Sequence, residues 1–152
     1  MRIRFVTVTV AAVLVVGLGV GTASAGGGPQ YQGSVEKDPN TFLGFDVTGS
    51  GKHRKVKNFS AGRIAVACDS QSSDGRAGEL KFVRALKVNK KGKFGGTASA
   101  KPVFRQALIP NFKMTVHGKL GRKGKATGTL ELNSTGVRCY TGALNWKAKK
   151  PK

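Results

Sequence analysis

Apolar and polar side chains alternate in short segments of this chain, and that period of two constrains the fold more than any other feature. In the clearest segment, Phe112, Met114 and Val116 share one face of an extended strand. Lys113 and Thr115 lie between them and fall on the other face, as is typical of a strand with one buried and one solvated side. An amphipathic helix would need apolar residues three and four positions apart in sequence, and helix-forming residues do not gather at that spacing anywhere after residue 25. The chain is therefore predicted to be all-β.

Glycine-containing turns separate these segments. Glycine makes up 22 of the 152 residues, roughly twice its average usage. Residues 79–89 are expected to form one long strand or a bent pair, and residues 69–78 an exposed loop. Val56 and Phe59 are an odd number of positions apart, which predicts a bulge or a frayed edge in their strand. The other strands are expected at 30–35, 43–47, 55–60, 64–68, 93–100, 112–120, 126–132 and 140–146, with a connection at 102–110 and with Tyr140 and Trp146 in the core.

Eight or nine short strands at about 8–12-residue spacing predict an antiparallel β-sandwich. A closed β-barrel is the alternative that fits the same spacing. The size of the chain suits one domain, which is predicted to span residues 31–148. A basic tail is expected to follow at 149–152.

The N-terminus has the three-part pattern of a secretory signal peptide. Arg2 and Arg4 provide a basic start, residues 5–20 form an apolar run, and residues 23–25 (Ala-Ser-Ala) are small. The apolar run of about 16 residues is shorter than the ~20 that span a bilayer. We therefore expect a secreted protein with no stable membrane insertion. The predicted segments are a signal peptide at 1–25, cleaved after Ala25, and a flexible leader at 26–30.

Cys68 and Cys139 are the only cysteines and are predicted to form one disulfide. An oxidising compartment and an even number of cysteines favour this pairing. A disulfide that closes a loop of about 70 residues stabilises a fold by roughly 4 kcal/mol in the chain-entropy model. A metal site is not expected, because His53 and His117 are far apart and no short ligand spacing occurs. No cofactor is expected either.

Short motifs of hairpin and core residues are spread over most of the chain after residue 25. They are Gly51-Lys52, residues 56–59 (Val-Lys-Asn-Phe), Cys68-Asp69, residues 118–120 (Gly-Lys-Leu), residues 125–130 (Lys-Ala-Thr-Gly-Thr-Leu), Cys139, Thr141-Gly142 and residues 146–148 (Trp-Lys-Ala). In these motifs the chain resembles a loose group of small secreted proteins of high-GC Gram-positive bacteria. The resemblance implies an all-β domain with paired cysteines, and it brings no activity, cofactor or catalytic residue.

Positive charge dominates the composition. Lys and Arg number 27 against 7 Asp and Glu, so the formal net charge is +20. Loss of the signal peptide would leave about +18, a self-repulsion that salt or a polyanion would relieve. Cations gather in the predicted turns, and turns collected at one end of the fold would together hold phosphates or carboxylates. The candidate polyanion-binding residues are Lys52, His53, Arg54, Lys55, Lys57, Lys90, Lys91, Lys93, Arg122, Lys123 and Lys125.

The leading hypothesis is a non-enzymatic secreted domain that binds an anionic cell-wall polymer, an acidic glycan or extracellular nucleic acid. Ordinary solvated turns are the alternative, because exposed lysines also keep strand edges apart. A small-ligand carrier would need an apolar cavity inside a closed barrel. A secreted hydrolase would need two carboxylates, or a serine and His117, to converge. The sequence has neither a Gly-x-Ser-x-Gly nor a His-Glu-x-x-His motif, and no catalytic residue is assigned.

Overall fold

The computed structural model describes residues 30–69, 75–102, 111–134 and 138–152. The predicted signal peptide lies outside the described residues, as does the predicted leader apart from Gln30. The predicted connection at 102–110 also lies outside them, apart from Pro102.

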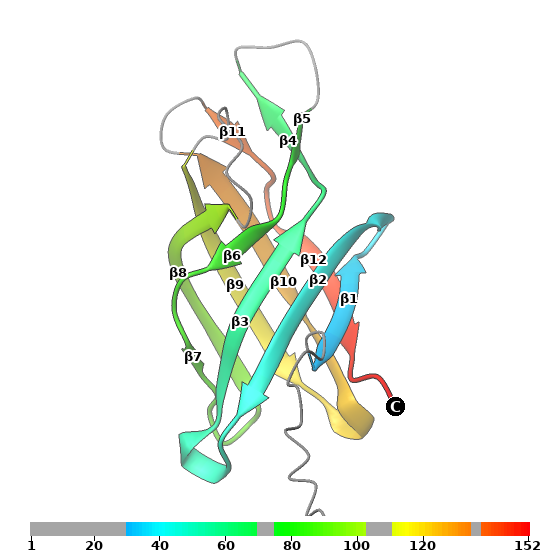
Figure 1. The fold of residues 1–152 in the computed structure, drawn as a ribbon, viewed down its shortest axis with the longest axis vertical. Helices are drawn as coiled ribbons and strands as arrows, with labels where there is room; N and C mark the ends of the chain where they lie inside the picture. Colours follow the sequence, from blue (N-terminus) through cyan, green and yellow to red (C-terminus); the bar gives the residue numbers. More distant parts are fainter. Residues whose placement is uncertain (1–29, 70–74, 103–110, 135–137) are drawn as a thin grey trace, which may run out of the picture.

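The described residues form a closed antiparallel barrel of eight strands, in which each barrel strand pairs with the barrel strand that follows it in sequence (Figure 1). One position in the barrel wall is shared by two short strands, β6 and β7, which both pair with β3. The barrel strands are β1 (Tyr31–Val35), β2 (Asp38–Thr48), β3 (Lys55–Gly62), β6 (Leu80–Phe82) with β7 (Leu86–Lys87), β8 (Lys93–Pro102), β9 (Phe112–Leu120), β10 (Lys125–Ser134) and β12 (Leu144–Lys149).

The closed barrel is the alternative that we gave beside the sandwich, and it is the architecture observed. The first and last strands pair with each other, with Gln32 opposite Lys149 and Val35 opposite Trp146. Since β12 also pairs with β10, the backbone donors and acceptors on both sides of β12 have ladder partners. In an open sandwich β1 and β12 would be edge strands, and closure removes those edges. The pairing also carries the ordered barrel to Lys149, past the predicted domain end at residue 148.

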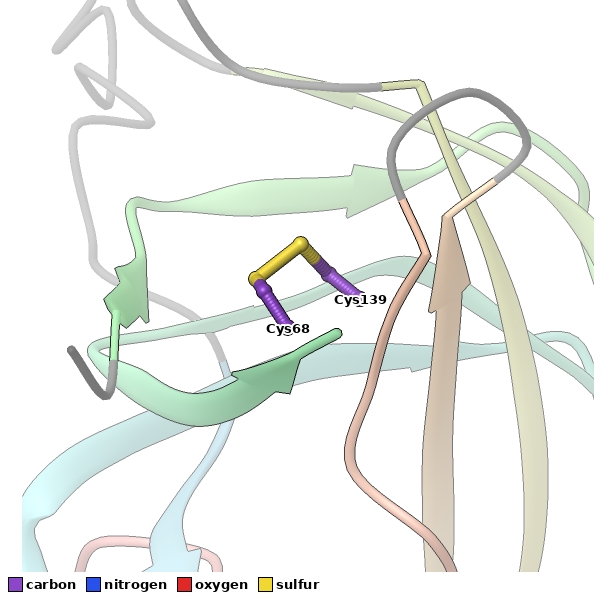
Figure 2. The surroundings of a disulfide bond; sticks show 2 residues. All are labelled: Cys68 and Cys139. Carbon is purple, nitrogen blue, oxygen red and sulfur yellow. A yellow bond between two sulfur atoms is a disulfide. The ribbon is translucent and has the colours of Figure 1, made fainter. Parts of the chain in front are cut away.

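A small extension of the sheet grows from β10 at one end of the barrel. It consists of β11 (Cys139–Tyr140), β4 (Ile64–Cys68) and β5 (Gly75–Ala77). The predicted disulfide is present: Cys68 and Cys139 are directly opposite in the β4–β11 pairing, with their Cα atoms 4.1 Å apart (Figure 2). We call this end of the barrel, with the β1–β2 turn beside it, the disulfide end.

The structure confirms some of the local predictions and shows that others are wrong. Residues 79–89 form the bent pair β6 and β7, as one of the two expected arrangements. Residues 75–77, by contrast, form β5 rather than part of a loop, because they pair with β4. Tyr140 is 48% exposed and is not a core residue, since β11 lies in the extension and not in the barrel wall, whereas Trp146 is 1% exposed and is a core residue.

The odd spacing of Val56 and Phe59 is explained by a β-bulge. The β2–β3 register shifts by one residue between Gly44 and Asp46, and Asn58 has a φ of +52°. Asn tolerates this left-handed conformation better than most residues. The extra residue lets both Val56 and Phe59 point into the barrel, where they are 0% and 1% exposed.

Four aromatic rings from different strands meet inside the barrel. Phe45 of β2 lies with its ring centroid 5.7 Å from that of Phe59, 5.9 Å from Phe94 and 6.0 Å from Trp146. The contact between Phe45 and Phe94 crosses the interior, because β2 and β8 lie on different sides of the barrel. An eight-stranded barrel has an interior that side chains can fill, and here the rings fill it. Gly128 makes room for the largest ring, because a Cβ at this position would collide with Trp146 and with the backbone of His117.

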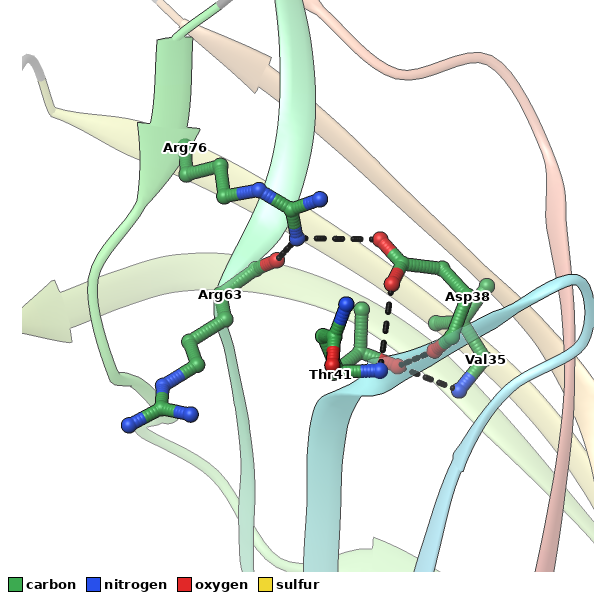
Figure 3. A network of polar contacts seen from close by, with 6 residues as sticks. Val35, Asp38, Thr41, Arg63 and Arg76 are labelled. Atoms are coloured by element: carbon green, nitrogen blue, oxygen red, sulfur yellow. Dashed lines mark hydrogen bonds and ion pairs between the residues drawn. The ribbon is translucent and has the colours of Figure 1, made fainter.

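A polar network holds the β1–β2 turn and β5 together at the disulfide end (Figure 3). The buried Thr41 hydroxyl accepts a hydrogen bond from the Val35 amide at 2.8 Å and donates one to the Asp38 carbonyl at 2.7 Å. The Asp38 carboxylate then pairs with Arg76 at 3.0 Å, and Arg76 also donates to the Arg63 carbonyl. Arg76 therefore has a carboxylate partner and ties β5 to the start of β2.

Gly128→Ala is expected to lower the free energy of unfolding by about 2 kcal/mol or more, because the new methyl group overfills the space that Trp146 occupies. Urea unfolding followed by tryptophan fluorescence measures the loss. Gly75→Ala is the matched control, because its Cβ would meet only Val66 at an ordinary 3.6 Å. Equal stability of the two variants would contradict the packing that we describe around Trp146.

Replacement of both Cys68 and Cys139 by Ala is expected to lower the free energy of unfolding by roughly 4 kcal/mol, since the bond closes a loop with a sequence separation of 71. Denaturant unfolding of the variant and of the reduced parent chain measures the effect. Both should lose a similar amount. A variant as stable as the oxidised parent would show that the disulfide does not stabilise the fold by lowering the conformational entropy of the unfolded chain.

Candidate anion-binding surface

Three turns that carry many of the cations lie at the same end of the barrel, opposite the disulfide end (Figure 1). They are the β2–β3 turn at 49–54, the β7–β8 turn at 88–92 and the β9–β10 turn at 121–124. Backbone hydrogen bonds connect neighbouring turns: Val88 N donates to Arg54 O, and Leu120 N at the end of β9 donates to Gly92 O, both at 2.9 Å. A third bond, from Lys150 N to Gly124 O at 2.8 Å, holds the residue after β12 against the β9–β10 turn. We call these turns, with the strand ends beside them, the basic end.

Lysines face each other across three strand pairs at the basic end. Paired residues in antiparallel strands direct their side chains to the same face, so each pair brings two ammonium groups together on the outside of the barrel. All six side chains are exposed. Like charges directly opposite destabilise a strand pair, and the same field attracts anions. The pairs are Lys55 with Lys87, Lys93 with Lys119, and Lys125 with Lys149.

Carboxylates that could neutralise these cations lie elsewhere. The ion pairs among the described residues are Arg76–Asp38, Arg138–Asp69 and Lys147–Glu36, and none of them contains a cation of the basic end. The eleven residues of β2 place its two ends about 33 Å apart, so Asp38 is far from the basic end. Asp46 is nearer and is directly opposite Lys57, but it forms no ion pair with a described residue, and its carboxylate accepts hydrogen bonds from Asn58 Nδ2 and from the Gln30 amide. The basic end thus keeps its charge.

The sequence-predicted cations come together at this end. Lys52 and His53 are exposed in the short helical turn η1 (Gly51–His53), and Arg122 and Lys123 are exposed in η2 (Arg122–Gly124). Arg54 is half-buried, and its Nε has no hydrogen-bond partner among the described residues. The other predicted residues, all exposed in the turns or at the strand ends, are Lys55, Lys57, Lys90, Lys91, Lys93 and Lys125.

The side chain of Asn89 shapes the β7–β8 turn that presents Lys90 and Lys91. Its Oδ1 accepts hydrogen bonds from the amides of Lys91 and Lys93, both at 2.9 Å. Gly92 then adopts a φ of +77°, and a Cβ there would meet the Leu120 carbonyl oxygen at 2.8 Å. This turn therefore holds its lysines on an ordered backbone rather than on a loose loop.

Four cations of the basic end were not among the predicted binding residues. Lys87 and Lys119 lie within strands, and only their register places them beside predicted residues. Lys149 and Lys150 were assigned to a tail, but the pairing of β12 with β1 and β10 brings them to the β9–β10 turn. The alternation of buried and exposed residues could have indicated that Lys87 and Lys119 face outwards, but not which cations they would meet.

The carboxylate side chains and His117, which a hydrolase or a metal site would need, do not come together among the described residues. Glu36 and Asp38 are each engaged in an ion pair with a cation. His117 is exposed on the outer face of β9, where it lies over Gly95. No three His, Cys, Asp or Glu side chains of the described residues group as metal ligands. The described residues also contain no helix of the length and apolarity needed to cross a membrane.

No protein-family model, curated protein or solved structure matches this chain. The resemblance to secreted proteins of high-GC bacteria stays a prediction.

Lys119→Glu is expected to stabilise the fold by about 0.5–1 kcal/mol at low salt, because it replaces the repulsion from Lys93 by attraction. Salt near 1 M, where the Debye length is about 3 Å, should remove most of this gain. Urea unfolding at the two salt concentrations measures it. Lys113→Glu makes the same charge change opposite the uncharged Ser99 and Asn133 and should gain clearly less. Equal gains in stability would show that the repulsion comes from the total charge and not from the lysine pairs.

Proposed function

We propose that this protein is a secreted, non-enzymatic β-barrel that binds anionic polymers through its basic end. The partner is an anionic cell-wall polymer, an acidic glycan or extracellular nucleic acid. These polymers share closely spaced phosphates or carboxylates. The proposal concerns that shared chemistry, and the test below distinguishes between the sources.

The single observation that carries the proposal is the ring of uncompensated cations at one end of the barrel. Hydrogen bonds join its three turns, and cross-strand lysine pairs continue it around the wall. A polymer can contact several of these cations at once and release its counterions, which makes binding strong and dependent on salt. Evenly scattered solvated lysines would not give such a continuous positive surface.

The packed interior of the barrel does not favour a small-ligand carrier. A carrier of this size would hold its ligand inside the barrel. That space is occupied by aromatic rings that contact one another, those of Phe45, Phe59, Phe94 and Trp146. A hydrolase finds no support in the ion-paired carboxylates described above. The outside of the barrel is therefore where we place binding.

Lys52→Glu, Lys90→Glu and Lys123→Glu, combined in one variant, are expected to weaken retention on heparin and on double-stranded DNA matrices. One exposed cation is reversed in each turn, so each loses one polymer contact. The slope of log affinity against log salt on DNA should fall in magnitude by about 3, close to 0.9 for each lost phosphate contact. Elution salt and the slope measured by titration are the readouts.

The matched control reverses three exposed cations at or near the disulfide end: Lys37→Glu, Lys113→Glu and Arg138→Glu. The change in net charge is the same, and each set contains one residue with a positive φ, Lys37 at +69° or Lys123 at +55°. The control should keep nearly all of the parent's retention. An equal loss in both variants, or parent retention that vanishes below physiological salt, would rule out the basic end as the binding surface. Purified wall polymer, glucuronate-containing glycan and DNA compared at one salt concentration then identify the preferred source.

A further inference from the structure

The barrel wall is interrupted on the side of β3, above the basic end. β6 pairs with Ser60 and Ala61 of β3, and β7 pairs with Lys55 and Val56. Residues 83–85 between these two strands belong to no strand, and residues 57–59 of β3 have no β6 or β7 partner opposite them. The bulge at Asn58 falls at the same level. Two irregularities in neighbouring strands thus coincide.

A groove of about 260 Å³ opens at this interruption. Cations from three strands and from the segment between β6 and β7 line it, and none of its described lining residues carries a carboxylate. None of these cations takes part in an ion pair of the described residues. Lys81 and Lys101 are directly opposite each other, which adds one more repulsive pair to the wall. The lining cations are Lys57, Lys81, Arg84 and Lys101.

One wall of the groove is apolar. Val83 is 43% exposed, one of two large hydrophobic side chains with that much exposure among the described residues, and Ala85 and the buried Phe82 also line the groove. A ligand with both an anionic group and a carbon skeleton would cover Val83 while it neutralises the cations. The volume is below the 300–1,000 Å³ typical of drug-sized ligands, so the groove suits one small unit.

The number and kind of cations favour a phosphate over a carboxylate. A phosphate monoester offers three terminal oxygens, whereas a carboxylate offers two, and four cations line this groove. The guanidinium of Arg84 can bind two phosphate oxygens side by side, and the lysines act as point charges around them. A phosphate carried on a short polyol or sugar skeleton therefore matches both sides of the groove.

We propose that this groove is a binding site for a single phosphorylated polyol or sugar unit. The site extends the proposed function, because Lys57 lies between the basic end and the groove and a bound polymer can continue from one to the other. It does not depend on that function, since a free phosphate monoester should occupy the groove alone. Lys81, Arg84 and Lys101 are its distinguishing residues.

Glycerol 3-phosphate, titrated into the purified protein at about 0.15 M salt and followed by calorimetry, is expected to bind saturably at one site. The variant Lys81→Gln, Arg84→Gln, Lys101→Gln should bind it at least about tenfold more weakly, because charge-assisted hydrogen bonds are lost. The matched variant Lys90→Gln, Lys91→Gln, Lys123→Gln removes the same charge from the turns and should bind it within about twofold of the parent. Urea unfolding of each variant confirms that it is folded.

Two further ligands and one further variant test the chemistry of the site. Inorganic phosphate and glucuronate should each bind more weakly than glycerol 3-phosphate, and Val83→Ser should remove the preference over inorganic phosphate. Unsaturable binding, equal losses in the two triple variants, or tighter binding of glucuronate would overturn the assignment. Heparin retention of the turn variant reports separately on the basic end, so failure of one proposal is distinguishable from failure of the other.

Discussion

The pairing of β1 with β12 determines the architecture of the barrel. It closes the barrel, so that neither the first nor the last strand leaves a row of unpaired backbone groups. Closure also fixes the diameter of the interior, which four aromatic rings then fill. Because each strand runs opposite to the last, every second turn falls at the same end. The β2–β3, β7–β8 and β9–β10 turns are brought together for that reason alone.

The fold tolerates a costly distribution of charge. Lysines are opposite lysines in three strand pairs at the basic end, and each pair weakens the ladder that carries it. The stability of that end comes from the apolar layer beneath, where Val56, Ala126 and Ala148 are almost completely buried. At the disulfide end the cations Arg76, Arg138 and Lys147 have carboxylate partners. The ion pairs of the described residues therefore all lie outside the basic end.

The irregular positions of the barrel are also where it offers the most distinctive surface. A regular ladder hides its backbone and presents an even row of side chains, whereas the bulge at Asn58 and the interruption at 83–85 leave a hollow between β3 and β8. Bulges and broken strands re-aim side chains in many barrels. Here they leave Val83 exposed among four cations, and that combination of an apolar wall with excess positive charge is what gives the groove a chemical preference.

The sequence alone was enough to predict the all-β class, most of the strand positions, the bulge near Phe59, the disulfide and the excess of cations in turns, because each depends on neighbours along the chain or on simple counts. Closure could not be predicted, since alternation reports which face of a strand is buried and not which strand lies beside it. Tyr140 looked like a core residue because its strand was assumed to belong to the main sheet. The folded structure was needed to show that the three turns share one end, that Lys87 and Lys119 join them, and that Lys81, Arg84 and Lys101 line a groove. Those facts depend on register between distant segments, which no local pattern encodes.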